Sequence, residues 1–371
     1  MKIQDFILPS ENCTHMGRLF PHPEEALLFD IETTGFSPRN AFVYLIGCAF
    51  YSGSSWQIRQ FLAEDAQQER QVLEAFLSFS ASFPLWVHFN GHTFDVPFLI
   101  SRTRTLGLSF AQPTGQLDLY KSISPYKNLL QLPGCRQKQL EEYLGIRRED
   151  PYHGGELIGL YLAYAKNRSE ELLAPVLLHN REDLSGLVSV CGLLAVPSLF
   201  EKSVFSILEA SYDAGALSLS LQLKLPLPAA ISCQTGPFCL AARQDRAVLR
   251  VSAHTGELKF FYPDYKNYAY LPLEDQAIHK SVAIYVDKTR RMPATAATCY
   301  TRRQGVFVPA PGPFSCQAPL FKENHESRQT FLLMDDAFLS NASLLTEYVK
   351  EALLVLSGRN AAGSQQKRTP K

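Results

Sequence analysis

The stretch LLFDIETTGFS, residues 27–37, places two carboxylates at the end of an apolar run. That run, which begins with EALLF at residues 25–29, has the pattern of a buried central strand. Side chains alternate faces along a strand, so Asp30 and Glu32 point to the same side. A buried carboxylate is costly unless it finds a partner or binds a cation. Oxygen-only ligands on one face suit Mg²⁺ or Mn²⁺, so this segment predicts a metal site.

Two further motifs carry acids that could meet the first pair. Asp95, in NGHTFD at residues 90–95, follows a strand and a turn and enters a helix, where the helix dipole also favours an acid. In HNREDL, residues 179–184, His179 and Asp183 are four residues apart and share one face of a helix. Taken alone, His179 has the pattern of a satisfied surface or core histidine. Together with the first pair, these acids could converge at one edge of an α/β sheet and hold two divalent ions.

The three motifs resemble, in order, spacing and local context, those of the DEDD superfamily of 3′–5′ exonucleases, which have an RNase H-like fold. They are FDIETTG at residues 29–35, NGHTFD and HNREDL. More narrowly, residues of about 26–195 look like the YprB-type RNase H-like domain of bacterial proteins. The resemblance covers roughly the first half of the chain, and we recognise no characterised family beyond about residue 200.

This resemblance implies a role for each acid. Asp30 would bridge two divalent ions, Mg²⁺ or Mn²⁺. Glu32 and Asp183 would complete the site that binds the attacking water, and Asp95 would serve the ion that stabilises the leaving oxygen. The turn formed by Thr33, Thr34 and Gly35 would approach the terminal nucleotide of the substrate, and Asn90 and Phe94 would pack against the substrate or support the fold.

The position of His179 departs from the family. One branch places a histidine five residues before the last aspartate, and another places a tyrosine four residues before it. His179 has the residue type of the first branch and the spacing of the second. A histidine can orient or deprotonate a water, and we expect His179 to do so. His88 and His92 are weaker candidates, and Asp118 is more simply a strand-end acid with a local hydrogen bond.

The order of expected elements predicts an α/β fold. Three strands are followed by a helix, a strand, a helix, a short strand and several helices, which gives a mixed five-stranded sheet flanked by helices. We expect an irregular lead-in at residues 1–25, the RNase H-like domain at 26–197, a smaller α+β, β-rich domain at 198–358 and a disordered tail at 359–371. Residues 203–223 have a possible helical pattern.

Composition narrows the class of protein but does not identify a partner. Hydrophobic residues make up 46% and charged residues 19% of 371 residues, as in ordinary globular proteins. Net charge is zero, yet residues 1–200 hold 16 Lys+Arg and 21 Asp+Glu, and the remainder holds 20 and 15. The eight cysteines are scattered without a C-x-x-C pair, so they predict neither a zinc site nor a disulfide framework. No signal peptide or spanning apolar stretch is recognised, and we expect a cytoplasmic protein without a membrane partner.

The second half carries aromatic and basic residues in alternation. GELKFFYPDYKNYAYLP, residues 256–272, interleaves Lys259 and Lys266 with six aromatic side chains, and basic residues follow between 280 and 303. Aromatic faces that stack bases and cations that follow phosphates hold single strands without sequence preference. The alternative is a β-rich domain whose aromatic residues fill its core and whose cations are solvated.

The leading hypothesis is a metal-dependent nuclease, most simply a 3′–5′ exonuclease on single-stranded DNA or RNA. One rival is a binding or adaptor protein that keeps the fold and has lost turnover. Another is a structure-selective endonuclease that uses the same metal site. The sequence does not choose between DNA and RNA, because contacts to the 2′-hydroxyl leave no recognisable pattern.

Overall fold

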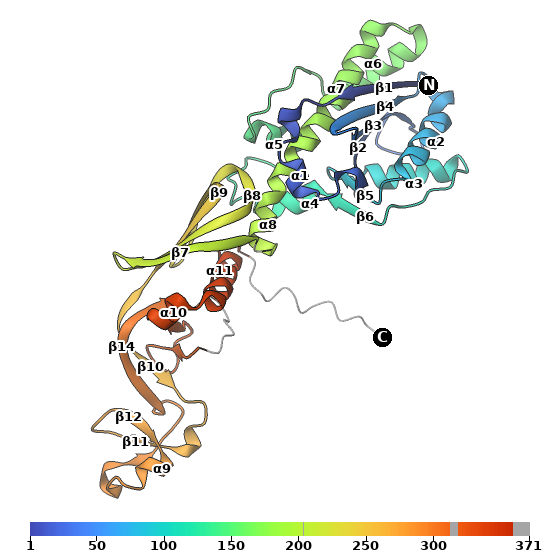
Figure 1. Ribbon diagram of the computed structural model, residues 1–371. Coiled ribbons are helices and arrows are strands. Elements are labelled where there is room, and N and C mark those ends of the chain that lie inside the picture. Colours follow the sequence, from blue (N-terminus) through green and yellow to red (C-terminus); the bar gives the residue numbers. More distant parts are fainter. Residues whose placement is uncertain (203, 312–317, 359–371) are drawn as a thin grey trace. The chain divides into compact units, whose positions relative to one another are not determined.

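The computed structural model describes all of the chain except residues 203, 312–317 and 359–371 (Figure 1). It divides into two compact units, one of residues 1–198 with 225–229 and the other of residues 199–224 with 230–371. The tail expected at residues 359–371 lies outside the described residues.

The first unit is built on a six-stranded mixed sheet with the strand order β1-β4-β3-β2-β5-β6. The strands are β1 (Lys2–Ile7), β2 (Ala26–Thr33), β3 (Val43–Ser52), β4 (Ser55–Leu62), β5 (Leu85–His88) and β6 (Gly115–Asp118). β2, β3 and β4 form an antiparallel meander, as expected, whereas β5 and β6 run parallel to β2. β2 therefore lies in the middle of the sheet, where its apolar residues are buried.

The sheet has six strands rather than the expected five, because the supposedly irregular lead-in contributes β1. KIQDFI alternates in burial along its length and pairs antiparallel with β4. Its exposed side chains are those of Ile3, Asp5 and Ile7, so two apolar residues and one charge face outward. The segment is short and its apolar residues do not alternate with its polar ones, so its sequence does not have the pattern of a strand.

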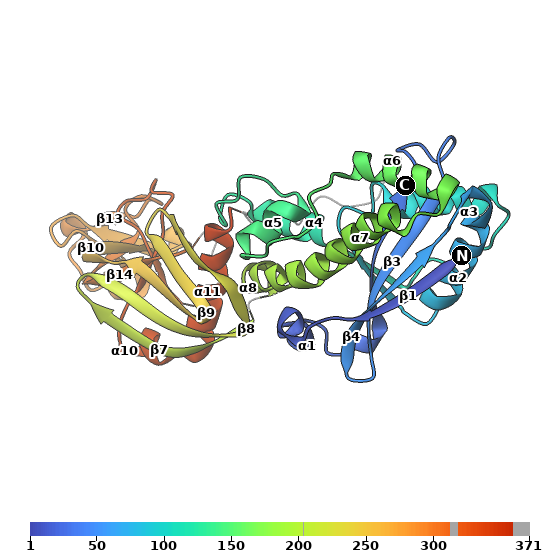
Figure 2. The same cartoon turned by 90° about the horizontal axis from the view of Figure 1, so that it is seen from above.

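Helices cover both faces of this sheet (Figures 1 and 2). On one face, α2 (Glu69–Ser80) and α3 (Asp95–Thr105) pack apolar residues such as Phe76 and Leu99 against β2 and β3. On the other face, α6 (Gly154–Asn167) and α7 (Glu170–Val190) pack against Tyr44 of β3, whose ring stacks on Tyr161. Short helices complete the unit: α1 (Met16–Leu19), α4 (Leu119–Ile123) and α5 (Gln137–Tyr143).

One helical run, Glu170–Lys202, is the part of the described chain that is long and apolar enough to cross a bilayer by length and composition. Within it, 72% of the most apolar window is buried inside the protein. Burial of this extent is what a core helix of a folded domain shows, and α7 packs against α5, α6, β2 and β3.

The second unit is rich in strands and carries two helices near its end. Its strands are β7 (Phe205–Asp213), β8 (Ala216–Thr235), β9 (Phe238–Ser252), β10 (His254–Phe261), β11 (Tyr268–Leu271), β12 (Gln276–His279), β13 (Met292–Pro293), β14 (Tyr300–Pro309), β15 (Leu320–Phe321) and β16 (Phe331–Leu333). They form the sheets β7-β8-β9, β10-β14-β16-β15 and β12-β11-β13. The helices are α8 (Ala195–Lys202), which lies across the boundary between the units in sequence, α9 (Lys280–Ala283), α10 (Asp336–Ser340) and α11 (Ala342–Leu356).

The prediction of a helix at residues 203–223 is wrong. From Phe205 onward the segment forms an antiparallel hairpin of β7 and β8, and residue 203 lies outside the described residues. The hairpin turns at Ala214 and Gly215, which both have positive φ, as the tight turn of a twisted hairpin requires. Leu217, Leu219 and Leu221 are buried at every second position, so the period is that of a strand.

The aromatic side chains of the second unit largely contact one another. Tyr262 and Tyr268 stack with ring centroids 4.5 Å apart, and the hydroxyls of Tyr270 and Tyr300 both donate to Asp275. The Lys259 ammonium lies 4.2 Å from the centroid of the Tyr300 ring. These contacts favour the alternative in which the aromatic residues stabilise the domain itself.

Candidate active site

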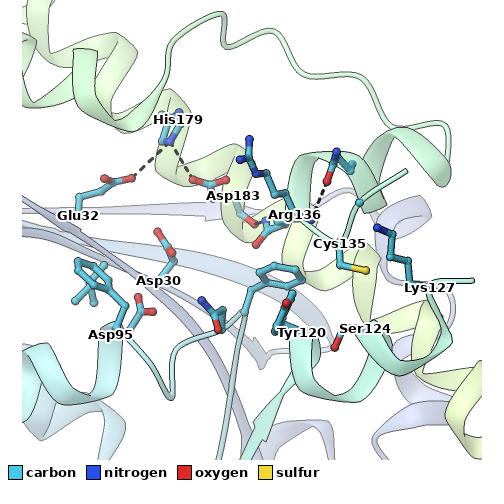
Figure 3. Close-up of a pocket in the computed structure, with 17 residues that line it drawn as sticks. Asp30, Glu32, Asp95, Tyr120, Ser124, Lys127, Cys135, Arg136, His179 and Asp183 are labelled. Atoms are coloured by element: carbon cyan, nitrogen blue, oxygen red, sulfur yellow. Dashed lines mark hydrogen bonds and ion pairs between the residues drawn. The ribbon is translucent and has the colours of Figure 1, made fainter. Parts of the chain in front are cut away.

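The four acids of the three motifs and His179 line one pocket of about 1210 Å³ in the first unit. Asp30 and Glu32 project from β2, Asp95 is the first residue of α3, and His179 and Asp183 project from successive turns of α7 (Figure 3). β2 ends beside α3 because β5, its parallel neighbour, leads through a short loop into that helix. The fold therefore brings together residues that lie up to 153 positions apart in sequence, from Asp30 to Asp183.

Three of these carboxylates repel one another in a buried setting. Burial, with the charges of the neighbouring acids, raises the pKa of Asp30 well above its usual range. Burial and the charges of Asp183 and Asp95 raise the pKa of Glu32 to about 8, against the attraction of His179. Burial raises the pKa of Asp95 to about 7, although backbone amides oppose the shift. Such a cluster binds a cation favourably, because a cation removes the repulsion.

Asp183 differs from the other three because it has two basic neighbours. Arg148 Nη1 lies 2.6 Å from Asp183 Oδ1, and His179 Nε2 lies 3.1 Å from Oδ2. Although burial alone would raise the pKa of Asp183, these two neighbours hold it below its usual value. Arg148 also binds both carboxylate oxygens of the buried Glu141, at 2.5 and 2.6 Å. Glu141, Arg148 and Asp183 therefore form an ionic triad in which Glu141 is buried and the other two are partly buried.

His179 is buried and held through both ring nitrogens. Nδ1 lies 2.5 Å from Asp150 Oδ2, while Nε2 faces Asp183 and lies 3.8 Å from Glu32 Oε1. Burial alone would lower the pKa of His179, but the hydrogen bonds and charges of Asp183, Glu32 and Asp150 raise it to about 9. The four-residue spacing therefore places the ring beside the acids.

A buried amide fixes Asp30. Asn180 Nδ2 donates to Asp30 Oδ2 over 3.2 Å, and Asn180 Oδ1 accepts from Gln60 Nε2 over 2.9 Å. Asn180 fits between α7 and β3 because residue 47 is a glycine, and a Cβ atom there would overlap the Asn180 amide. This network orients one oxygen of Asp30 toward α7.

The donor set fits a divalent cation. Glu32, His179 and Asp183 each offer one ligand atom, and these atoms lie within 4.8 Å of one another. Asp30 and Asp95 add carboxylates at the same pocket. Carboxylate oxygens are the ligands that Mg²⁺ and Mn²⁺ prefer.

The pocket also has a basic wall. Lys127, Arg136 and Tyr120 line it (Figure 3). Phe89 also lines the pocket, and its ring packs edge to face against that of Tyr120. Both cations are exposed, and neither makes an ion pair within the described part of the chain. The pocket therefore joins a cluster of acids to two free positive charges.

The residues expected to bind substrate separate into two groups. Asn90 and Phe94 line the pocket. Thr33, Thr34 and Gly35 do not, and they use their polar groups locally. The Thr33 hydroxyl donates to the Gly35 carbonyl over 2.9 Å, and Thr34 Oγ1 accepts from the Phe42 amide over 3.1 Å.

His88, His92 and Asp118 form a second group, beside the loop that leads to α3. Asp118 accepts the backbone amides of Asn90, His92 and Lys121 and lies 3.1 Å from the His92 Nδ1 atom. The group could also hold a metal by the spacing of its ligand atoms. Asp118 ends β6 and makes the expected local bond to Lys121, but its other partners, Asn90 and His92, come from the loop that follows β5.

Several residues at the site were missed by sequence reasoning. Asn180 lies inside the HNREDL motif, and this position was the signal in the sequence that could have identified it as a site residue. Arg148 and Asp150 come from the connection between α5 and α6, which has no periodic pattern to place it. Lys127 and Arg136 come from the connection between α4 and α5. Contacts made by such segments depend on the folded path of the chain.

Comparison with protein families supports the fold. Residues 27–195 match the model of the RNase_H superfamily. With the six-stranded mixed sheet flanked by helices, this match shows an RNase H-like domain, followed by a β-rich C-terminal region. The expected α/β fold class is thereby confirmed. No curated protein matches the sequence.

Solved structures of nucleic-acid enzymes align more loosely. The family B DNA polymerase of the hyperthermophilic archaeon Pyrobaculum calidifontis covers 65% of this chain at 15% identity, with a TM-score of 0.36. This alignment spans only 35% of the polymerase. The zinc-bound complex of E. coli ExoI with ssDNA covers 53% of this chain and 54% of its own at 13% identity, with a TM-score of 0.28. A product-bound exonuclease I covers 75% and 64%, also at 13% identity and a TM-score of 0.28. With all TM-scores below 0.5, the family match remains the basis for the fold.

Proposed function

We propose that this protein is a metal-dependent nuclease, specifically a DEDD-type 3′–5′ exonuclease that hydrolyses single-stranded DNA or RNA. The observation that carries the proposal is the convergence of Asp30, Glu32, Asp95 and Asp183 at one pocket. Acids that raise one another's pKa are expensive to fold, and a site for divalent cations explains their presence. The resemblance of the three motifs supports the direction of cleavage.

The four carboxylates would hold two divalent ions, which when bound activate a water and stabilise the leaving oxygen of a phosphodiester. Asp30 is restrained by Asn180, which belongs to the same helix as Asp183. His179 Nε2 faces Asp183 and Glu32, so it is placed to orient the attacking water.

The basic wall supports a nucleic-acid substrate. Lys127 and Arg136 can neutralise backbone phosphates, which supplies affinity that the acidic cluster lacks. Phe89 and Tyr120, which line the same pocket, offer aromatic faces for unpaired bases. A single strand would therefore enter over Lys127 and Arg136, with its 3′ end at the acids.

The test is a degradation assay with 5′-labelled single-stranded DNA and RNA, each in Mn²⁺, Mg²⁺ or EDTA. We expect a ladder that shortens from the 3′ end, requires metal and is absent from Asp30→Asn. Asp213→Asn, which changes an exposed acid on β7, is the matched control and should degrade as the wild type does.

The rivals give different results in the same assay. Cutting of substrates with blocked 3′ ends would identify an endonuclease. Tight binding of the oligonucleotide without cutting in any metal would identify a binding or adaptor protein. Either result overturns the exonuclease proposal.

A further inference from the structure

Asp150 is a completely buried acid that belongs to none of the three motifs. Its side chain has no exposed surface and lies in the connection between α5 and α6. Oδ2 lies 2.5 Å from His179 Nδ1 and 3.5 Å from Lys138 Nζ, and Oδ1 accepts the backbone amide of Tyr152 over 3.0 Å. Both oxygens are therefore engaged, and the strongest contact is with the histidine of the candidate site.

The segment that carries Asp150 is attached to α7 itself. Glu182, one residue before Asp183, accepts the backbone amides of Glu149 and Asp150 through its two carboxylate oxygens, over 2.9 and 3.0 Å. Lys138 of α5 donates to the Tyr152 carbonyl over 3.1 Å. These bonds fix the backbone of Asp150 relative to the helix turn that carries His179.

The contact with Asp150 determines which way the imidazole points. With Nδ1 occupied by Asp150, Nε2 is left to face Asp183 and Glu32. A ring flip would leave the buried Asp150 carboxylate without its shortest partner, which is unfavourable. A carboxylate on one ring nitrogen is a general means of setting which nitrogen serves the site.

We propose that Asp150 is a positioning residue, which holds His179 so that Nε2 is directed at the carboxylates where water is activated. This inference rests on the proposed nuclease function. It also explains how a histidine at the four-residue spacing serves the site. The position of the ring is set by Asp150 and by the helix together, so spacing along the helix alone does not decide it.

Asp150→Asn tests the proposal, because it removes the charge and keeps the shape. Glu149→Gln is the matched control: Glu149 is the exposed neighbour on the same segment, and its side chain makes no described contact. We expect kcat of Asp150→Asn to fall about 10- to 100-fold with KM within about twofold, since loss of an outer partner has effects of this size. Glu149→Gln should match the wild type.

A double variant separates positioning from support of the fold. If Asp150 acts through His179, then Asp150→Asn should add little to the defect of His179→Gln. A double variant much slower than His179→Gln alone, or an unchanged kcat in Asp150→Asn, would overturn the proposal. If Asp150→Asn fails to fold, Asp150→Ser removes the same carboxylate with a smaller side chain, and the same results are expected.

A second measurement does not depend on activity. In metal-free protein labelled at histidine, the ring signals of His179, assigned by their loss in His179→Gln, should form one set in the wild type and in Glu149→Gln. Asp150→Asn should give two sets or exchange broadening, because the ring is no longer held. Unchanged ring signals in Asp150→Asn would refute positioning. A wild type with the expected signals but no nuclease activity would refute the proposed function and leave the role of Asp150 in orienting the ring intact.

Discussion

Two groups of histidine and carboxylate lie in the first unit, and they differ in what occupies the carboxylates. At the Asp118 group, backbone amides of Asn90, His92 and Lys121 donate to one acid. Burial would raise the pKa of Asp118, but these amides and the histidines hold it below its usual value. At the pocket, Asp30 and Glu32 face other acids instead, and their pKa values are raised. A carboxylate satisfied by amides shapes a loop, whereas carboxylates that repel one another indicate a cation site.

The largest expected difference between the groups is in catalysis. Asp30→Asn should lower kcat at least about 1000-fold, or about 4 kcal/mol in the barrier, because it removes a ligand for the divalent ions. Asp118→Asn should retain most activity and lose about 1–3 kcal/mol of unfolding free energy, because it weakens the bonds of a buried carboxylate to backbone amides. Single-turnover assays and urea unfolding measure the two effects. An inactive but fully stable Asp118→Asn would move the second group into the active site.

The next largest expected effect is on stability, and it concerns the ionic triad of Glu141, Arg148 and Asp183. Arg148→Met leaves Glu141 buried without its bidentate partner, and we expect a loss of about 3–5 kcal/mol in the free energy of unfolding. Arg147→Met changes the exposed neighbour and should stay within about 0.5 kcal/mol. Equal stability of the two variants in urea would show that the triad contributes nothing to the fold.

The two groups should also respond to pH with opposite sign. The raised pKa values of Glu32, about 8, and Asp95, about 7, mean that the folded metal-free protein binds more protons than the unfolded chain. These acids therefore destabilise the protein as pH rises from about 4.5 to 8. Asp118 has a lowered pKa, so its contribution is present above its ordinary value of 3.8 and is lost as pH falls below it.

Bound Mg²⁺ should reverse the loss of stability that Glu32 and Asp95 cause as pH rises. Mg²⁺ binding requires deprotonated carboxylates, so the increase in Tm on adding Mg²⁺ should grow from pH 6 to pH 9. Thermal unfolding with and without Mg²⁺ measures this increase, and Asp30→Asn should lack it. A Tm increase that is constant over this range would argue against metal at Glu32 and Asp95.

The smallest expected effect concerns the basic wall. Lys127→Ala combined with Arg136→Ala should raise KM about tenfold with little change in kcat, since each residue binds a phosphate in the proposed path. The salt dependence of oligonucleotide binding should also become shallower, by about 0.7 in the log–log slope for each phosphate that the protein no longer neutralises. Lys166→Ala, an exposed cation on α6, is the control and should change neither quantity. An unchanged slope in the double variant would place the strand elsewhere.

The sequence predicted the parts of the site that follow from regular structure. Asp30 and Glu32 share a face because strands alternate, and His179 and Asp183 share one because helices repeat every 3.6 residues. Asp95 was placed by its position at the start of a helix. The same periodicity predicted the α/β order of the elements that the family match and the sheet support.

The parts that were missed depend on irregular segments or on short patterns. Arg148 and Asp150 reach the site from a connection whose path is set by Glu182 and Lys138, which no local pattern reveals. The hairpin from Phe205 was expected to be helical, although the spacing of its buried leucines is that of a strand. Edge strand β1 was overlooked because half of its residues are polar.

Gly47 limits the mutations that the protein can tolerate. It lies on β3, outside every motif, and its lack of a side chain gives Asn180 the space from which it reaches Asp30. A single base change turns a glycine codon into an alanine codon, and the added methyl group would displace the amide and the carboxylate behind it. Inactive forms of this domain could therefore arise with all four acids still present. A search for lost activity should examine the small residues that make room for the site as well as the acids.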